Sequence, residues 1–221
     1  MNPYGWKSFY MKEEEFYLLL AGKGVRRWYG LSSDRRESFL RDTSKEAVYG
    51  VLAGLYQKGY VDWCEEQVAI AEPMDIILQA LKDSAYCVMA EQEGERQSYY
   101  LSYGKIVLVE ESKRQRGRLK LTLLTKEEFL NNLWEEGYLP KREGVTAFDG
   151  QEGSRVKKVY DRAILRFLQV EDGRQMERLI IKEMGMEVLV TWEHDFSEEI
   201  LPYQKDWCEK RLNQWCNRRQ K

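Results

Sequence analysis

The chain has 221 residues, of which 43% are hydrophobic and 33% are charged, and its formal net charge at pH 7 is −2. This balance is typical of a globular protein rather than a disordered tail, and the near-neutral charge excludes a general attraction to nucleic acid or anionic lipid. Because no apolar run approaches the roughly 20 residues of a membrane-spanning helix, and the first residues do not resemble a signal peptide, we expect a cytoplasmic protein without membrane contact.

The first 85 residues are expected to be mainly helical. Four helices are expected at 12–21, 33–41, 44–58 and 74–81, with short strands at 60–63 and 67–71. Thr43 and Glu46 form a capping-box pattern before the third helix, and Gly59 marks its end. Three helices followed by a two-stranded wing predict a winged-helix-like N-terminal subdomain over residues 1–85.

From Tyr86 onward hydrophobic residues recur at every second position, which is typical of strands. Seven strands are expected at 87–91, 98–103, 105–110, 118–124, 160–170, 176–183 and 186–192. Thr125 is expected to cap a helix that continues to Glu136, and Pro202 to begin a final helix.

The Gly-rich and charged segment 141–154 is the best internal boundary in the chain. The order of elements predicts an α+β fold, with an antiparallel sheet of about seven strands and flanking helices. The sheet and its packing helices are expected to form a second unit, 86–221, either as a separate domain or as part of one continuous domain.

The sequence contains no catalytic, metal or cofactor motif. Its single histidine, His194, stands between two acidic residues at an expected strand end, where neighbouring side chains point in different directions and seldom share a ligand. Cys208 and Cys216 are separated by about 12 Å along an expected helix, too far for a disulfide. The four cysteines are expected to be reduced and buried. We therefore expect no cofactor and no enzyme, with an enzyme of unknown class as an open alternative.

The strongest basic cluster crosses an expected hairpin turn. A solubilising surface is the simplest interpretation of such a cluster. The functional alternatives are a contact for an acidic patch on a protein partner and, less favoured, a contact for RNA or DNA. On the final helix, Cys208, Leu212 and Trp215 form an apolar stripe suited to the core or to a partner. The residues predicted to bind a partner are Lys113, Arg114, Arg116, Arg118, Trp207 and Trp215.

A winged-helix DNA-binding regulator is the main alternative function. Its recognition helix would carry only Lys45 and Lys58 as basic residues, with no Arg, Asn or Gln near its N-terminus. The wing is acidic at Glu65 and Glu66, which would repel phosphate. Nucleic acid is therefore disfavoured as a partner.

Several short sequence patterns follow one another along the chain in an order that is similar to that of a known protein family. They are L-x(2)-L-x(3)-G-Y-V, P-M-D-I-I-L-Q-A-L, the strand-rich segment 87–109, L-W-E-E-G-Y-L-P and V-E-D-G-R-Q-M-E-R-L-I-I-K. Over most of the chain this layout resembles the EspG-type chaperones of type VII secretion systems. The resemblance implies a central antiparallel sheet flanked by two helical subdomains. It also implies a non-catalytic, chaperone-like adaptor whose partner is a small helical secreted protein.

Overall fold

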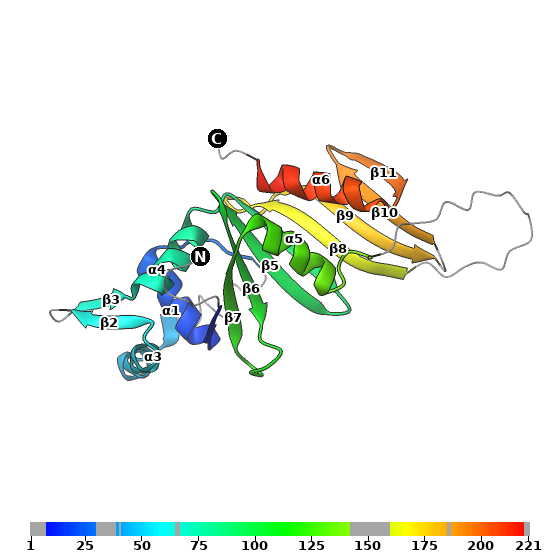
Figure 1. Cartoon of the computed structure of the whole chain (residues 1–221). Coiled ribbons are helices and arrows are strands. Elements are labelled where there is room, and N and C mark those ends of the chain that lie inside the picture. The colour runs from blue at the N-terminus through cyan, green and yellow to red at the C-terminus, as the bar shows by residue number, and fades with distance from the viewer. Residues whose placement is uncertain are drawn as a thin grey trace, which may run out of the picture.

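A computed structural model describes residues 8–29, 39, 41–64, 67–141, 160–184 and 187–218. Its centre is one antiparallel sheet with the strand order β1-β7-β6-β5-β4-β8-β9-β10-β11, and helices cover both of its faces (Figure 1). The strands of this sheet are β1 (Ser8–Met11), β4 (Tyr86–Gln92), β5 (Glu95–Ser102), β6 (Lys105–Glu111), β7 (Leu119–Leu124), β8 (Tyr160–Gln169), β9 (Gln175–Met184), β10 (Glu187–His194) and β11 (Ser197–Pro202). The α+β class is confirmed.

The sheet has nine strands rather than the seven expected. All seven expected strands are present, and the two additional strands, β1 and β11, are the two edges of the sheet. Nearly every residue of β11 is exposed, so this strand has no alternation of buried and exposed positions by which a sequence pattern could reveal it.

The described elements of the N-terminal unit follow one another in the expected order. After β1 it comprises α1 (Glu13–Lys23), α3 (Lys45–Gln57), β2 (Val61–Cys64), β3 (Gln67–Ile70) and α4 (Glu72–Lys82). The expected helix at 33–41 falls mostly outside the described residues, as do Glu65 and Glu66 of the wing. The cap of α3 is Ser44 rather than Thr43, because the Ser44 side chain accepts a hydrogen bond from the Ala47 amide. Gly59 ends this helix with a φ of +68°, as expected.

One apolar cluster joins the N-terminal unit to the sheet. Phe16 and Leu20 of α1 lie in it together with strand residues such as Tyr100, Val107 and Leu121. The two parts of the chain therefore share a core on this face of the sheet. The division at residue 85 into separate domains stays a prediction.

A second apolar cluster lies on the opposite face, under α5 (Lys126–Glu135) and α6 (Lys205–Cys216). The Thr125 side chain accepts a hydrogen bond from the Glu128 amide, which confirms the expected cap of α5. Pro202 was expected to begin α6, but it is the last residue of β11 and the helix begins at Lys205. No helix within the described ranges is long and apolar enough to cross a membrane.

Candidate protein-binding site at the β6–β7 hairpin

The turn between β6 and β7 is held by its own hydrogen bonds. The Ser112 amide donates to the Arg118 carbonyl at 2.7 Å, and the Arg118 amide donates to the Gln115 carbonyl at 3.1 Å. The Ser112 hydroxyl accepts from the Gln115 amide at 3.0 Å. Gly117 takes a φ of +72°, a backbone conformation that costs glycine little. The turn therefore presents its basic side chains from an ordered backbone.

Lys113 ties this turn to two other elements. Its ammonium lies 2.7 Å from Glu136, the residue that caps α5, and 3.0 Å from Glu95 at the start of β5. The hydrogen bonds to Glu136 and Glu95 raise the pKa of Lys113 above its ordinary value. The charge of Lys113 is thus already paired with two carboxylates, so Lys113 is better suited to hold the turn in place than to bind a partner.

Arg114 and Arg116 are the unpaired charges of the basic cluster. Both are exposed, and neither forms an ion pair with any residue that the structure describes. By contrast, Lys120 pairs with Glu110 at 2.8 Å, and Arg118 is half-buried. Of the predicted basic residues, only Arg114 and Arg116 offer their full charge to solvent.

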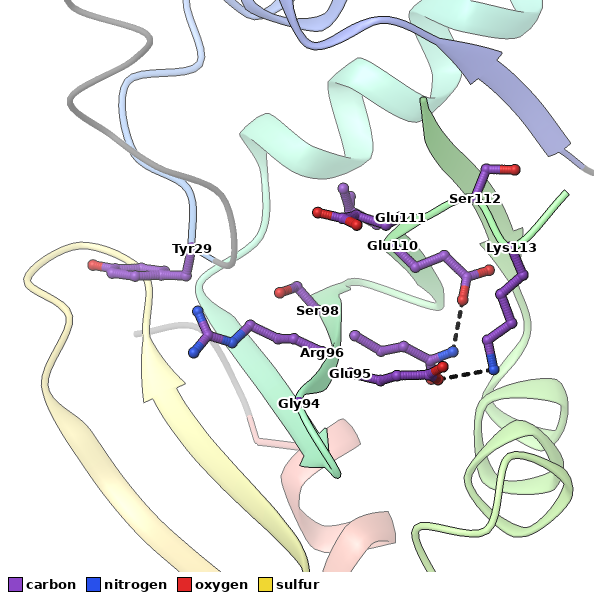
Figure 2. A pocket seen from close by; sticks show the side chains of 11 residues that line it. Tyr29, Gly94, Glu95, Arg96, Ser98, Glu110, Glu111, Ser112 and Lys113 are labelled. Carbon is purple, nitrogen blue, oxygen red and sulfur yellow. Dashed lines mark hydrogen bonds and ion pairs between the residues drawn. The ribbon is translucent and has the colours of Figure 1, made fainter. Parts of the chain in front are cut away.

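A cavity of about 310 Å³ opens beside this turn (Figure 2). Its lining combines carboxylates with the cations of Arg96 and Lys113. On its floor, Gln97 donates a hydrogen bond of 2.6 Å to Glu110. Figure 2 shows Lys113 reaching from the β6–β7 turn to Glu95 across one side of the cavity. The cavity is lined by polar and charged groups that can bind a polar side chain, and its lining includes Lys113, the residue before Arg114.

The floor of the cavity is fixed by a buried tyrosine behind it. The Tyr99 hydroxyl lies 2.5 Å from the side-chain oxygen of Gln97 and 2.7 Å from that of Asn132 in α5, so its single proton is shared between these two acceptors. Burial raises the pKa of Tyr99 well above its ordinary value. Tyr99 therefore stays neutral at physiological pH and keeps the proton that it shares between Gln97 and Asn132.

The two predicted tryptophans lie away from the turn. Trp215 is only 1% exposed, because its ring stacks on Phe167 with a centroid distance of 5.1 Å. This burial removes Trp215 from the predicted contact surface and places it in the core. Trp207 is half-buried and contacts Trp192 of β10 edge-on at 5.7 Å. In Figure 1, α6 lies at the top and the β6–β7 turn at the bottom, so the predicted residues do not form one surface.

His194 belongs to an aromatic and ionic cluster. Its ring stacks on Trp192 at 3.5 Å, and its Nε2 atom lies 3.1 Å from Glu199. Among the described residues, no group of three or more His, Cys, Asp or Glu side chains is placed to hold a metal ion. The four cysteines are free thiols, and Cys87 and Cys208 are buried as expected, but Cys64 is exposed and Cys216 is only half-buried.

The helix α3 carries an exposed apolar surface that sequence reasoning missed. Ten consecutive residues, 47–56, are uncharged, yet only Leu55 of this helix is buried. Tyr49 and Tyr56 project into solvent, as does Trp63 of the adjacent β2. A long uncharged run without a polar face was the signal available in the sequence. Lys58, at the end of the helix, pairs with Glu15 at 2.5 Å, so it is not free for DNA phosphate.

Comparison with known proteins gives a match in structure but none in sequence. No protein-family model and no curated protein sequence matches the chain. Among solved structures, it is similar to the Mycobacterium tuberculosis type VII secretion system chaperone EspG5, solved in complex with the PE25-PPE41 dimer. The TM-score is 0.56 and the identity 10%, and the match covers 93% of this chain and 94% of the other. The chain therefore has an EspG-like fold, as the order of its elements indicated.

Proposed function

We propose that this chain is a non-catalytic, chaperone-like adaptor that binds a protein partner through the β6–β7 turn. The observation that carries the proposal is the EspG-like fold, which extends over 93% of the chain and resembles a chaperone solved with its protein partners. By the same argument, the partner is a small helical secretion substrate that the chain escorts in the cytoplasm.

The charges of the turn support this role. Arg114 and Arg116 lie in a turn whose backbone is internally bonded and which Lys113 ties to the end of α5. Such exposed charges steer an oppositely charged segment during encounter, and they affect the association rate more than the final affinity. An acidic segment of the partner would meet the two arginines first.

The cavity beside the turn supports a second step of partner binding, after the first encounter with the arginines. Its floor is fixed by the bonds among Gln97, Glu110 and Tyr99, so little has to become ordered when a ligand enters. A polar side chain of the partner, next to its acidic segment, would fill the cavity after the first encounter. The proposed contact surface is therefore Arg114, Arg116 and the rim of the cavity.

Affinity capture from the native cell extract, with and without nuclease, tests the proposal. The tagged wild type is compared with Arg114→Glu/Arg116→Glu and with a matched control, Lys105→Glu/Lys210→Glu, which makes the same charge change at two other exposed positions. We expect a protein partner that survives nuclease treatment, is retained by the control and is depleted with the arginine variant.

Two outcomes would contradict the proposal. Equal recovery with both variants would remove the turn from the contact surface. Partners that all disappear on nuclease treatment would favour the winged-helix regulator, since phosphate contacts would then hold them.

A further inference from the structure

The outward-facing backbone groups are hydrogen-bonded at one edge of the central sheet and open at the other. At the β1 edge, the Tyr60 hydroxyl accepts a hydrogen bond from the Tyr10 amide at 3.1 Å and donates one to the Tyr10 carbonyl at 3.2 Å. One side chain thus satisfies both outward-facing backbone groups of Tyr10. An edge covered in this way offers little to an incoming strand.

The opposite edge, β11, leaves its backbone groups open. The register places His194 opposite Ser197 across a two-residue turn, in which Asp195 and Phe196 have φ values of +43° and +66°. Hydrogen-bonded pairs then alternate along the hairpin. The bond from the Tyr203 amide to the Val188 carbonyl confirms that the odd-numbered residues face β10.

The even-numbered residues Glu198 and Ile200 therefore point their amides and carbonyls away from the sheet. No residue in the described part of the chain bonds to these groups. Pro202 follows at the next outward position, where its missing amide hydrogen costs no bond to β10. The Ile200 side chain is 62% exposed. The edge has the backbone pattern and the apolar side chain that strand addition requires.

The negative charge of the β10–β11 hairpin determines which kind of strand would pair with its edge. Residues 187–202 contain five acidic residues and no Lys or Arg. Like charges placed opposite each other across a ladder destabilise the pair, and opposite charges stabilise it. The carboxylates of Glu198 and Glu199 on the outer strand thus favour a basic strand.

We propose that the β11 edge binds an extended basic segment of a partner protein by antiparallel strand addition. In that register, apolar side chains of the partner lie opposite Leu201 and Ile200, and basic side chains lie opposite Glu199 and Glu198. The partner segment reads apolar-apolar-basic-basic from its N-terminus. This site is separate from the β6–β7 turn and does not depend on the function proposed for that turn.

A capped, fluorescein-labelled peptide, Thr-Val-Ile-Lys-Arg-Thr, is a suitable probe. Its isoleucine would lie opposite Ile200 and exchange backbone hydrogen bonds with it. N-methylation of the peptide's isoleucine removes a donor that faces the edge, whereas N-methylation of its valine leaves the facing donors intact and serves as the control. We expect the first modification to weaken binding about tenfold more than the second, because it leaves a carbonyl of the edge unbonded.

Amide hydrogen exchange followed by NMR gives the direct readout. With the full chain and saturating peptide, we expect exchange to slow at Glu198 and Ile200. At Glu199 and Leu201, whose amides already face β10, it should not change. Equal slowing at all four residues, or no slowing at any, would overturn the strand-addition geometry.

Two variants test the edge itself. Ile200→Pro removes an outward-facing amide donor without removing a bond to β10. It should lower the affinity for the peptide about tenfold while the circular dichroism spectrum stays unchanged. The variant Glu198→Lys/Glu199→Lys should no longer bind the basic peptide and should instead bind an acidic peptide, Thr-Val-Ile-Glu-Glu-Thr. Unchanged affinity in both variants would overturn the proposal. Light scattering that shows a dimer of this chain, abolished by Ile200→Pro, would assign the edge to a second copy and overturn it as well.

Discussion

The Lys113 ammonium lies 2.7 Å from the Glu136 carboxylate and so joins the β6–β7 turn to the end of α5. The two residues are 23 positions apart in the chain. Glu95 at the start of β5 completes the bridge at 3.0 Å. Arg114 and Arg116 therefore extend from a turn that Lys113 anchors to α5 and β5.

Replacing Lys113 by methionine should lower the free energy of unfolding by about 1 kcal/mol, since partly exposed ion pairs contribute little more than this. Denaturant titration measures the change. Arg114→Met is the control, because Arg114 has no ion pair with a described residue, and it should leave stability within about 0.5 kcal/mol of the wild type. A larger loss in the control would contradict the assigned roles.

The contribution of Lys113 to the free energy of unfolding should fall, and never rise, as the pH increases. Its folded-state pKa is raised, so the folded chain holds the proton more tightly than the unfolded chain does. The stabilisation is fully present below the ordinary lysine pKa of about 10.4 and is lost as the pH rises through the higher, folded-state value. The stability difference between wild type and Lys113→Met should thus be constant from about pH 7 to about pH 9 and shrink above about pH 10.5. A difference that grows with pH would contradict this linkage.

Tyr60→Phe should expose the β1 edge. The substitution removes the hydroxyl that bonds to both backbone groups of Tyr10, which should cost about 1–2 kcal/mol and speed hydrogen exchange of the Tyr10 amide. Tyr56→Phe removes a hydroxyl from an exposed residue and is the matched control. Equal exchange rates at Tyr10 in the two variants would show that the hydroxyl does not protect the edge.

Two glycines of α3 should respond differently to alanine. A Cβ atom at Gly50 would meet nothing within 4 Å, so Gly50→Ala should stabilise the chain by about 1 kcal/mol through helix propensity. A Cβ atom at Gly54 would lie 3.1 Å from the Glu15 carboxylate, which is held by the Lys12 amide and by Lys58. Gly54→Ala should therefore be the less stable variant, and thermal unfolding that ranks the two in the opposite order would contradict this packing.

The thiols should react in two classes. Cys64 is exposed, whereas burial raises the pKa of Cys208 and of Cys216 to about 12 and also raises that of Cys87. A thiol reagent at about pH 8 should modify one cysteine quickly in the native chain and the other three only after unfolding. Cys64→Ser should abolish the fast phase. More than one fast thiol in the wild type would contradict the described burial.

Local signals predicted much of the fold. Thr125 and Gly59 each mark a helix end through bonds to their own neighbours, so the sequence alone located both. Strands with one buried face, such as β7, were found by their alternation. The edge strand β11 was missed because its backbone pairs on one side only and its side chains are mostly exposed. Pro202 fits this strand for the same reason, although it more often signals a helix start.

The candidate site was harder to predict because its roles depend on contacts between distant residues. Lys113 looked like its basic neighbours in the sequence, yet only it reaches two carboxylates. Trp207 and Trp215 share one helix, but the sequence did not reveal which ring would stack on Phe167 and leave the surface. The α3 surface was missed because an apolar run normally indicates burial.

The rate at which the captured partner associates with the immobilised chain tests the central claim most directly. Biolayer interferometry at two salt concentrations should give an association rate that falls at least about tenfold in Arg114→Glu/Arg116→Glu, with a weaker salt dependence than in the wild type. The control Lys105→Glu/Lys210→Glu should keep the wild-type rate within about twofold, because it changes the same net charge elsewhere. Equal association rates for the two variants would show that the β6–β7 turn does not receive the partner.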